Sequence, residues 1–264
     1  MTVFLPLSQA EQGKLVSAVH AAQYVRPGMR LGLGTGSTAA WLVRYLAYRN
    51  RKANLGVTCV ATSSVTAQQA KTLGLSLSSL EDTPNLNLVV DGADEFDPQL
   101  NLIKGAGGAL LQEKLVAVAA DQMVVITDPS KEKAKLGAFP LSVEIVRFGW
   151  QGTAARIEHA LGVAPQRRMV GSEPFVTDEG NFIVDLAFGQ IDDARAVHNT
   201  LKSLTGVVET GLFLDIATRV VIGAPAGAAQ VLEKGGRVTH PWPEDVDLTE
   251  LAEILVKADP NVGV

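Results

Sequence analysis

The feature that most constrains the fold is an alternation of apolar runs and helical stretches over roughly the first 140 residues. Four runs are rich in Val, Leu, Ile or Met at both odd and even positions, namely 29–34, 55–62, 86–94 and 122–128. Between them lie segments with the length and apolar spacing of crossover helices, including 37–48, 65–73 and 108–120. Strands that are apolar on both faces are covered by helices on both sides. This pattern predicts an α/β domain built on a parallel sheet.

The order of elements changes from about Phe139. The later segments read strand 141–148, helix 152–161, strand 166–177, strand 182–188, helix 191–204 and strand 206–213. This β-α-β-β-α-β order is that of a ferredoxin-like module. We therefore predict an inserted α+β ferredoxin-like domain at 140–209, and a first domain formed by 1–139 and 210–264. Near the end of the chain, Asp247 and Glu250 form a predicted capping box that opens a short helix.

Composition excludes several classes of partner. The formal net charge is −5, so there is no basic surplus that would indicate nucleic acid binding. The chain has no run of about 18 uncharged apolar residues and does not start with a positively charged leader, so we expect a cytoplasmic protein with no membrane association. Cys59, the single cysteine, excludes an internal disulfide and a cysteine-cluster zinc site, and its apolar surroundings predict a buried structural thiol.

In a parallel sheet, ligands bind beyond the carboxyl ends of the strands. The first such position is the glycine loop, Gly34–Thr38, in which glycines allow a close backbone approach and the following helix offers N–H groups to an anion. The loop and Ala39 also match the G-x-G-x-x-A dinucleotide pattern. However, residues 62–64 after the second strand are Thr-Ser-Ser, without the acidic residue that binds ribose. A small phosphate ester is therefore favoured over a dinucleotide, and a turn without a ligand stays open.

The second position holds four carboxylates directly after the strand at 86–94: Asp91, Asp94, Glu95 and Asp97. A metal-binding loop is disfavoured because the EF-hand spacing is missing and no histidine is near. A plain acidic turn remains one alternative. The place of these carboxylates beside the glycine loop favours hydrogen bonds to sugar hydroxyls or proton transfer.

The third position is Lys104, which precedes a glycine run and a helix. On that helix Glu113 has apolar residues three and four positions away in both directions, whereas its neighbours Gln112 and Lys114 are predicted to lie on solvated faces. A carboxylate on an apolar face is either paired with a buried lysine or arginine, or serves as a general base. The residues themselves leave both alternatives open. After the next strand, Lys131 adds positive charge at the same edge of the sheet.

These parts suit proton transfer on a sugar phosphate. A carboxylate base removes a proton α to a carbonyl and returns it to the neighbouring carbon through an enediol or enediolate. Lysine and backbone N–H groups stabilise the oxyanion that develops. No metal site and no nucleotide site are expected.

The stretches GLGTGSTA, DGADE and KGAGGALLQEK, in this order, resemble those of ribose-5-phosphate isomerases of the A type. The resemblance covers almost the whole chain and includes GNFIVD and GVVETGLF. It implies a Rossmann-like domain with a smaller α+β domain, and interconversion of ribose 5-phosphate and ribulose 5-phosphate in the non-oxidative pentose phosphate pathway. It also implies that neither a metal nor another cofactor is needed, and that the protein is a homodimer or homotetramer.

The same resemblance implies roles for individual residues. Glu113 corresponds to the base that transfers the proton, and Asp91, Asp94 and Lys104 correspond to the other catalytic residues. The substrate-binding residues it implies are Thr35, Gly36, Ser37, Thr38, Asp91, Gly92, Ala93, Asp94, Lys104, Gly105, Ala106, Gly107 and Lys131. A substrate contact of Lys14 is left open. Residues 105–108 read Gly-Ala-Gly-Gly where the family pattern is Gly-Gly-Gly-Ala, which leaves the conformation of this loop in question.

The sequence leaves two other classes of function as alternatives. An amino-sugar-phosphate deaminase would carry a catalytic histidine in a loop, and a phosphogluconolactonase is a neighbouring alternative. The four histidines, at 20, 159, 198 and 240, lie in helix-like stretches or in the tail. A sugar-phosphate sensor without catalysis would need an output module, and the insertion reads as α+β rather than as a helix-turn-helix.

Overall fold

The computed structural model describes residues 7–225, 227–244, 246–247, 251 and 255. The chain forms two compact units: the first contains 1–92, 116–130 and 218–264, and the second contains 93–115 and 131–217. Each unit is described by itself below. Glu250, which completes the predicted C-terminal capping box, lies outside the described residues.

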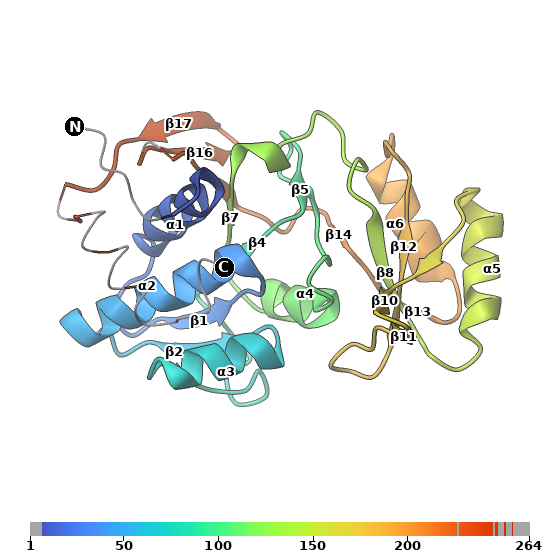
Figure 1. Cartoon of the computed structure of the whole chain (residues 1–264), viewed down its shortest axis with the longest axis horizontal. Helices are drawn as coiled ribbons and strands as arrows, with labels where there is room; N and C mark the ends of the chain where they lie inside the picture. Colours follow the sequence, from blue (N-terminus) through green and yellow to red (C-terminus); the bar gives the residue numbers. More distant parts are fainter. Residues whose placement is uncertain (1–6, 226, 245, 248–250, 252–254, 256–264) are drawn as a thin grey trace. The chain divides into compact units, whose positions relative to one another are not determined.

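The first unit is built on an eight-stranded sheet in the order β17-β16-β15-β7-β4-β1-β2-β3 (Figure 1). The strands are β1 Arg30–Leu33, β2 Thr58–Ala61, β3 Ser76–Leu77, β4 Leu88–Gly92, β7 Met123–Thr127, β15 Arg219–Gly223, β16 Ala229–Glu233 and β17 Gly236–His240. Pairing is parallel from β15 to β3 and antiparallel between β15, β16 and β17. The predicted parallel sheet is confirmed, and each of its four predicted strands is present.

Three helices complete the first unit: α1 Gln9–Ala22, α2 Ser37–Ala53 and α3 Ser64–Thr72. Each begins where the sequence supplies a local start: the hydroxyls of Ser8 and Ser63 accept hydrogen bonds from N–H groups in the first turns of α1 and α3, and Gly36 precedes α2. Leu15, Trp41 and Leu42 from α1 and α2 pack with residues of β1, β4 and β7 in one apolar core.

Cys59 is fully buried in β2, as predicted. Burial raises the pKa of its thiol to about 12, so the side chain stays a neutral thiol at physiological pH. Within the part of the chain that the structure describes, no helix has the length and apolar character needed to cross a membrane.

The second unit contains a four-stranded antiparallel sheet in the order β13-β8-β12-β9. Along the chain its elements are β8 Leu141–Ile145, α5 Trp150–Leu161, β9 Gln166–Arg167, β12 Phe182–Leu186, α6 Ala194–Ser203 and β13 Val207–Thr210. A three-stranded sheet is formed by β5 Glu95–Phe96, β6 Leu102–Ile103 and β14 Leu212–Phe213, and a hairpin by β10 Met169–Val170 and β11 Glu173–Pro174. Helix α4, Leu110–Val118, starts in the second unit, and its last residues belong to the first.

Two predicted strands differ from the structure. The segment 166–177 is not one strand, because the chain turns back at Gly171 (φ 59°) and forms the β10–β11 hairpin after β9. The segment 206–213 is divided at Gly211 into β13 and β14, which belong to different sheets. A Cβ atom on Gly211 would lie 2.1 Å from the carbonyl oxygen of Lys104, so this close approach requires glycine and interrupts the strand.

The compact units also divide the chain differently from the predicted boundaries, since 93–115 lies in the second unit. The reason is local packing: Ile103 of β6 and Leu212 of β14 share an apolar core with Leu141 and Val143 of β8. The compact units describe local packing, whereas the predicted boundaries describe the order of elements along the chain.

The four-stranded sheet has one apolar and one polar face. Leu141, Val143 and Ile145 of β8 point into the core with Ile157 of α5 and Leu201 of α6. Because side chains alternate along a strand, Ser142 and Glu144 point to the opposite face. Both are nonetheless completely buried. This polar face, which also carries Asp185 of β12, is therefore covered by other parts of the unit.

Burial of Glu144 on this polar face should make the free energy of unfolding depend on pH. Its Oε1 accepts hydrogen bonds from Thr177 Oγ1 and Asn181 Nδ2, both at 2.9 Å. Burial raises the pKa of Glu144, and the two hydrogen bonds oppose this shift. A raised folded-state pKa stabilises the fold at low pH, and this stabilisation is lost as pH rises.

We therefore expect Glu144→Gln to become progressively more stable relative to the parent as pH rises from 4 to 8. The measurement is the free energy of unfolding by urea at each pH, with Glu158→Gln, exposed on α5, as the control. A stability difference that does not change with pH would show that Glu144 has no such role.

Candidate active site

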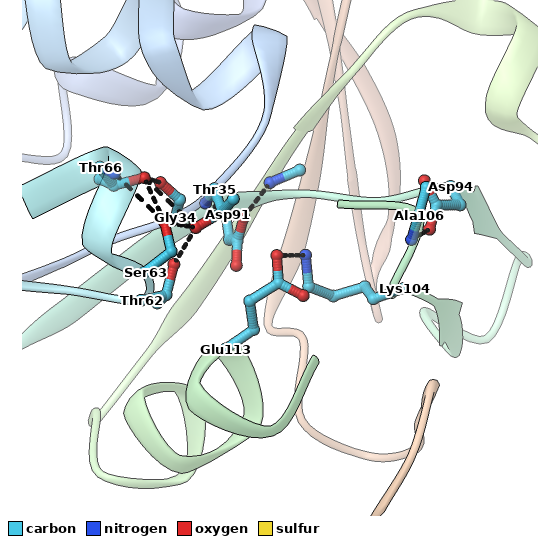
Figure 2. A network of polar contacts seen from close by, with 12 residues as sticks. Gly34, Thr35, Thr62, Ser63, Thr66, Asp91, Asp94, Lys104, Ala106 and Glu113 are labelled. Atoms are coloured by element: carbon cyan, nitrogen blue, oxygen red, sulfur yellow. Dashed lines mark hydrogen bonds and ion pairs between the residues drawn. The ribbon is translucent and has the colours of Figure 1, made fainter. Parts of the chain in front are cut away.

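The glycine loop follows β1 and leads into α2, and hydroxyl groups hold its threonine in place (Figure 2). Thr35 Oγ1 lies 2.8 Å from both Thr62 Oγ1 and Ser63 Oγ, and 3.2 Å from Thr66 Oγ1. Thr66 Oγ1 in turn donates to the carbonyl oxygen of Gly34 at 3.0 Å. The hydroxyl residues after β2, whose lack of an acidic side chain argues against a dinucleotide, therefore fix the shape of this loop.

Asp91, at the end of β4, is fully buried against the same loop. Its Oδ1 accepts hydrogen bonds from the N–H groups of Thr35, at 3.1 Å, and Gly92, at 2.7 Å. A Cβ atom on Gly34 would lie 2.1 Å from that oxygen and 2.5 Å from the Asp91 Cα. Gly34 is thus required by the close approach of Asp91, a reason independent of any dinucleotide.

The start of α2 offers a site for an anion. Gly36 is its N-cap (φ 105°) and has no side chain to cap the helix, and Ser37 begins its first turn. Gly36 and Ser37 are exposed, and Thr38 is half-buried. A 17-residue helix carries a positive dipole end and outward-facing N–H groups at this point, which suits a phosphate group.

In the second unit, Lys104 and Glu113 form a buried ion pair. Lys104 Nζ lies 3.3 Å from Glu113 Oε1, and the side chains are 3% and 5% exposed. Glu113 is in the first turn of α4, whereas Lys104 follows β6 and its N–H donates to the carbonyl oxygen of Gly211 at 2.9 Å. Glu113 therefore fits both alternatives that the sequence leaves open, a buried ion pair and a general base. It is paired with a buried lysine, and that lysine is itself a predicted site residue (Figure 2).

Lys114 contradicts the prediction that it is solvated. It is 9% exposed, and its ammonium group donates to Glu209 Oε1 at 2.8 Å and to the carbonyl oxygens of Thr210, at 2.6 Å, and Leu212, at 2.9 Å. Burial lowers the pKa of Lys114, and the Glu209 carboxylate opposes this shift. These bonds anchor the middle of α4 to β13 and β14. The sequence pattern along α4 could not predict these bonds, because the partners of Lys114 lie about a hundred residues further along the chain.

Asp94 holds the lysine loop, Lys104–Gly107. Its own N–H donates to the carbonyl oxygen of Ile103 at 2.8 Å, and its Oδ2 accepts from the N–H of Ala106 at 2.9 Å (Figure 2). One of the differences from the family pattern at 105–108 is explained here. Gly108, which follows the lysine loop, has φ 78°, and a Cβ atom on it would lie 2.2 Å from the ring of Phe175, so position 108 requires glycine.

The other two carboxylates of the acidic stretch are structural. Glu95 is buried and accepts hydrogen bonds from the N–H groups of Gly137, at 2.7 Å, and Phe139, at 2.6 Å. Asp97 accepts from the backbone and the side chain of Asn101, at 2.8 and 2.9 Å. Only Asp91 and Asp94 hold loops with predicted substrate contacts. Among the residues that the structure describes, no group of three or more His, Cys, Asp or Glu side chains is suited to a metal ion.

The remaining predicted residues lie on short local structures. Lys131 ends a 3-10 turn after β7 and is half-buried. Lys14 of α1 is ion-paired with Glu11 at 2.6 Å, and Glu11 also accepts a hydrogen bond from Trp41 Nε1 at 2.7 Å. His20 is buried and lies 3.1 Å from the carbonyl oxygen of Gly227, which matches a packing role.

Comparisons with known proteins point to one family. Residues 58–227 match the family model described as ribose 5-phosphate isomerase A (phosphoriboisomerase A). A ribose-5-phosphate isomerase A of Dinoroseobacter shibae is 50% identical over 255 residues, which cover 94% of this chain and 97% of that protein. The solved ribose 5-phosphate isomerase A of Methanocaldococcus jannaschii superposes with a TM-score of 0.78 at 34% identity, covering 89% of this chain and 100% of that one. A solved D-ribose-5-phosphate isomerase in complex with phospho-erythronic acid superposes with a TM-score of 0.79 at 30% identity, covering 89% of this chain and 100% of that one.

Proposed function

The chain belongs to the ribose-5-phosphate isomerase A family, and from this we propose how its own residues carry out the reaction. The protein is an isomerase that interconverts ribose 5-phosphate and ribulose 5-phosphate. The deaminase, lactonase and sensor alternatives are set aside by this membership. The observation that carries the proposed mechanism is the buried ion pair of Glu113 with Lys104.

Glu113 is the base in this mechanism. In the open-chain aldose its carboxylate takes the proton from C2, which is α to the C1 carbonyl, and the C1 oxygen becomes an enediolate oxygen. The protonated Glu113 then returns the proton to C1, while the C2 hydroxyl proton moves to the C1 oxygen and C2 becomes the ketone. The ammonium group of Lys104, 3.3 Å from Glu113 Oε1, stabilises the negative oxygen of the intermediate.

The other residues bind and orient the substrate. The phosphate group binds at the glycine loop, through Thr35, Gly36, Ser37 and Thr38 and the N-terminus of α2. Asp91 and Asp94 accept hydrogen bonds from sugar hydroxyls and assist ring opening. Further contacts come from Gly92, Ala93, Gly105, Ala106, Gly107 and Lys131. A solved relative is in complex with phospho-erythronic acid, a phosphorylated sugar acid that has the chemical groups this arrangement is suited to bind.

We also propose the finer organisation of the protein. Residues 1–139 and 210–264 form a Rossmann-like domain, and 140–209 form an inserted ferredoxin-like domain. The element order of the second unit and its sheet order β13-β8-β12-β9 support the latter. The enzyme acts in the cytoplasm, in the non-oxidative pentose phosphate pathway, as a homodimer or homotetramer. The single, buried cysteine fits a reducing compartment.

Proton transfer without a metal ion predicts the outcome of one experiment. The purified enzyme is incubated with ribose 5-phosphate in D₂O with excess chelator, and the sugar phosphates are analysed by NMR. We expect full turnover in the presence of chelator and a growing amount of carbon-bound deuterium over many cycles, because the proton on a carboxylic acid exchanges with solvent. Turnover without any carbon-bound deuterium would contradict the base mechanism, and loss of turnover with chelator would contradict metal independence.

A further inference from the structure

Arg168 connects the polar face of the four-stranded sheet to the lysine loop. It follows β9, and its N–H donates to the carbonyl oxygen of Ile183 in β12 at 2.9 Å. The guanidinium group forms a two-pronged ion pair with Asp185, with Nε 2.9 Å from Oδ2 and Nη2 bonded to Oδ1. Nη2 also donates to Ser142 Oγ at 2.7 Å. The side chain is 16% exposed, so these bonds fix a largely buried charge.

The remaining nitrogen of the guanidinium holds the loop backbone. Nη1 donates to the carbonyl oxygen of Gly105 at 2.6 Å and to that of Ala106 at 3.2 Å. Arg168 thus binds two successive peptide groups. These two groups directly follow Lys104 in the chain. Its planar fork of donors allows one side chain to reach a carboxylate, a hydroxyl and two carbonyls, which a lysine cannot do.

These contacts decide which way the loop amides point. None of the peptide bonds that the structure describes is cis, and in a trans peptide the C=O and the next N–H point in opposite directions. With the carbonyls of Gly105 and Ala106 turned toward Arg168, the N–H groups of Ala106 and Gly107 are turned away from it. The N–H of Ala106 meets Asp94 Oδ2 at 2.9 Å on that other side.

The backbone of the lysine loop also packs closely against the sheet. Gly105 has φ 119°, and a Cβ atom on it would lie 2.7 Å from Ser142 Cβ. The backbone therefore lies directly on β8. Without the guanidinium group, the two carbonyls would face the polar sheet with a donor missing, and a rotation of either peptide plane would be the simplest relief.

We propose that Arg168 is a positioning residue for the isomerase reaction: it orients the peptide groups of Gly105 and Ala106 and thereby places Lys104 and the loop N–H groups for the enediolate. This inference rests on the proposed roles of Lys104 and Glu113. Because the negative oxygen develops only as the proton leaves, misplacement of its donors lowers kcat more than it weakens substrate binding.

The test compares two neighbouring arginines. Arg168→Ala is expected to lower kcat by about 10²-fold, with a change in KM of less than about threefold. Free guanidinium ion, added well below denaturing concentrations, is expected to restore part of the lost kcat. The matched control is Arg167→Ala, because Arg167 lies on the other face, with its guanidinium 4.5 Å from the ring centre of Trp150. We expect it to keep the parental kcat and to show no response to guanidinium.

Further variants keep the inference falsifiable. Circular dichroism and thermal unfolding establish that each variant is folded, and Arg168→Lys, which keeps the charge but not the fork, replaces Arg168→Ala if the latter is not. Parental kcat in a folded Arg168 variant would overturn the inference, as would an equal loss in Arg167→Ala or a loss confined to KM. Glu113→Gln is measured alongside: if it retains turnover, the base assignment fails, whereas an active Arg168→Ala beside an inactive Glu113→Gln refutes the role of Arg168.

Discussion

Glu113→Gln is expected to lower kcat by about 10³ to 10⁴-fold, at the upper end of what a positioned general base contributes. The amide has nearly the same shape as the carboxylate but cannot accept the proton from C2. Lys104 Nζ, 3.3 Å from Glu113 Oε1, retains an oxygen acceptor in the variant. The fold and the affinity for ribose 5-phosphate should therefore change little, and the loss should lie in the chemical step.

The measurements are steady-state kinetics of ribulose 5-phosphate formation and calorimetric titration with ribose 5-phosphate. Glu158→Gln makes the same chemical change at an exposed position on α5 and serves as the control. Turnover within tenfold of the parent would remove Glu113 from the role of base. If binding is lost together with turnover, Glu113 contributes to substrate affinity as well, and the purely chemical role is wrong.

Lys104→Met is expected to have two large effects. Without the ammonium group the enediolate loses its main cationic partner, so kcat falls by about 10² to 10³-fold. The change also leaves the buried carboxylate of Glu113 without this partner. Removing one member of a buried ion pair costs about 3–5 kcal/mol, and we expect the free energy of unfolding to fall by about 3 kcal/mol.

A double variant separates these effects. Adding Glu113→Gln to Lys104→Met removes the buried carboxylate charge that has lost Lys104, so part of the stability should return while activity stays lost. Urea unfolding and steady-state kinetics on the parent, both single variants and the double variant complete the cycle. Lys71→Met, at an exposed position of α3, is the control. Unchanged stability in Lys104→Met, or activity regained in the double variant, would contradict this account of the pair.

The parallel sheet was predictable because its signal is local. Strands β1, β2, β4 and β7 are apolar at successive positions, which indicates burial on both faces wherever the neighbours come from. The candidate site followed from the same reasoning, since the carboxyl ends of parallel strands share one edge of a sheet. Glu113 stood out because a carboxylate on an apolar helix face needs a partner or a function.

Other features depend on which distant segments meet. The sequence predicts one strand at 206–213, and the strand breaks at Gly211 because the carbonyl of Lys104 approaches there. Lys114 looks like a solvated helix residue until its partners on β13 and β14 are known.

The sequence alone specifies the classes of elements and indicates the loops and residue types of the candidate site. Tertiary structure decided the partner of each buried polar group: Lys104 for Glu113, the hydroxyls after β2 for Thr35, and Arg168 for the lysine loop, 63 residues away. The physical reason is that periodicity reports whether a side chain is buried, whereas a hydrogen bond or ion pair depends on distance and direction between segments that only the folded chain brings together.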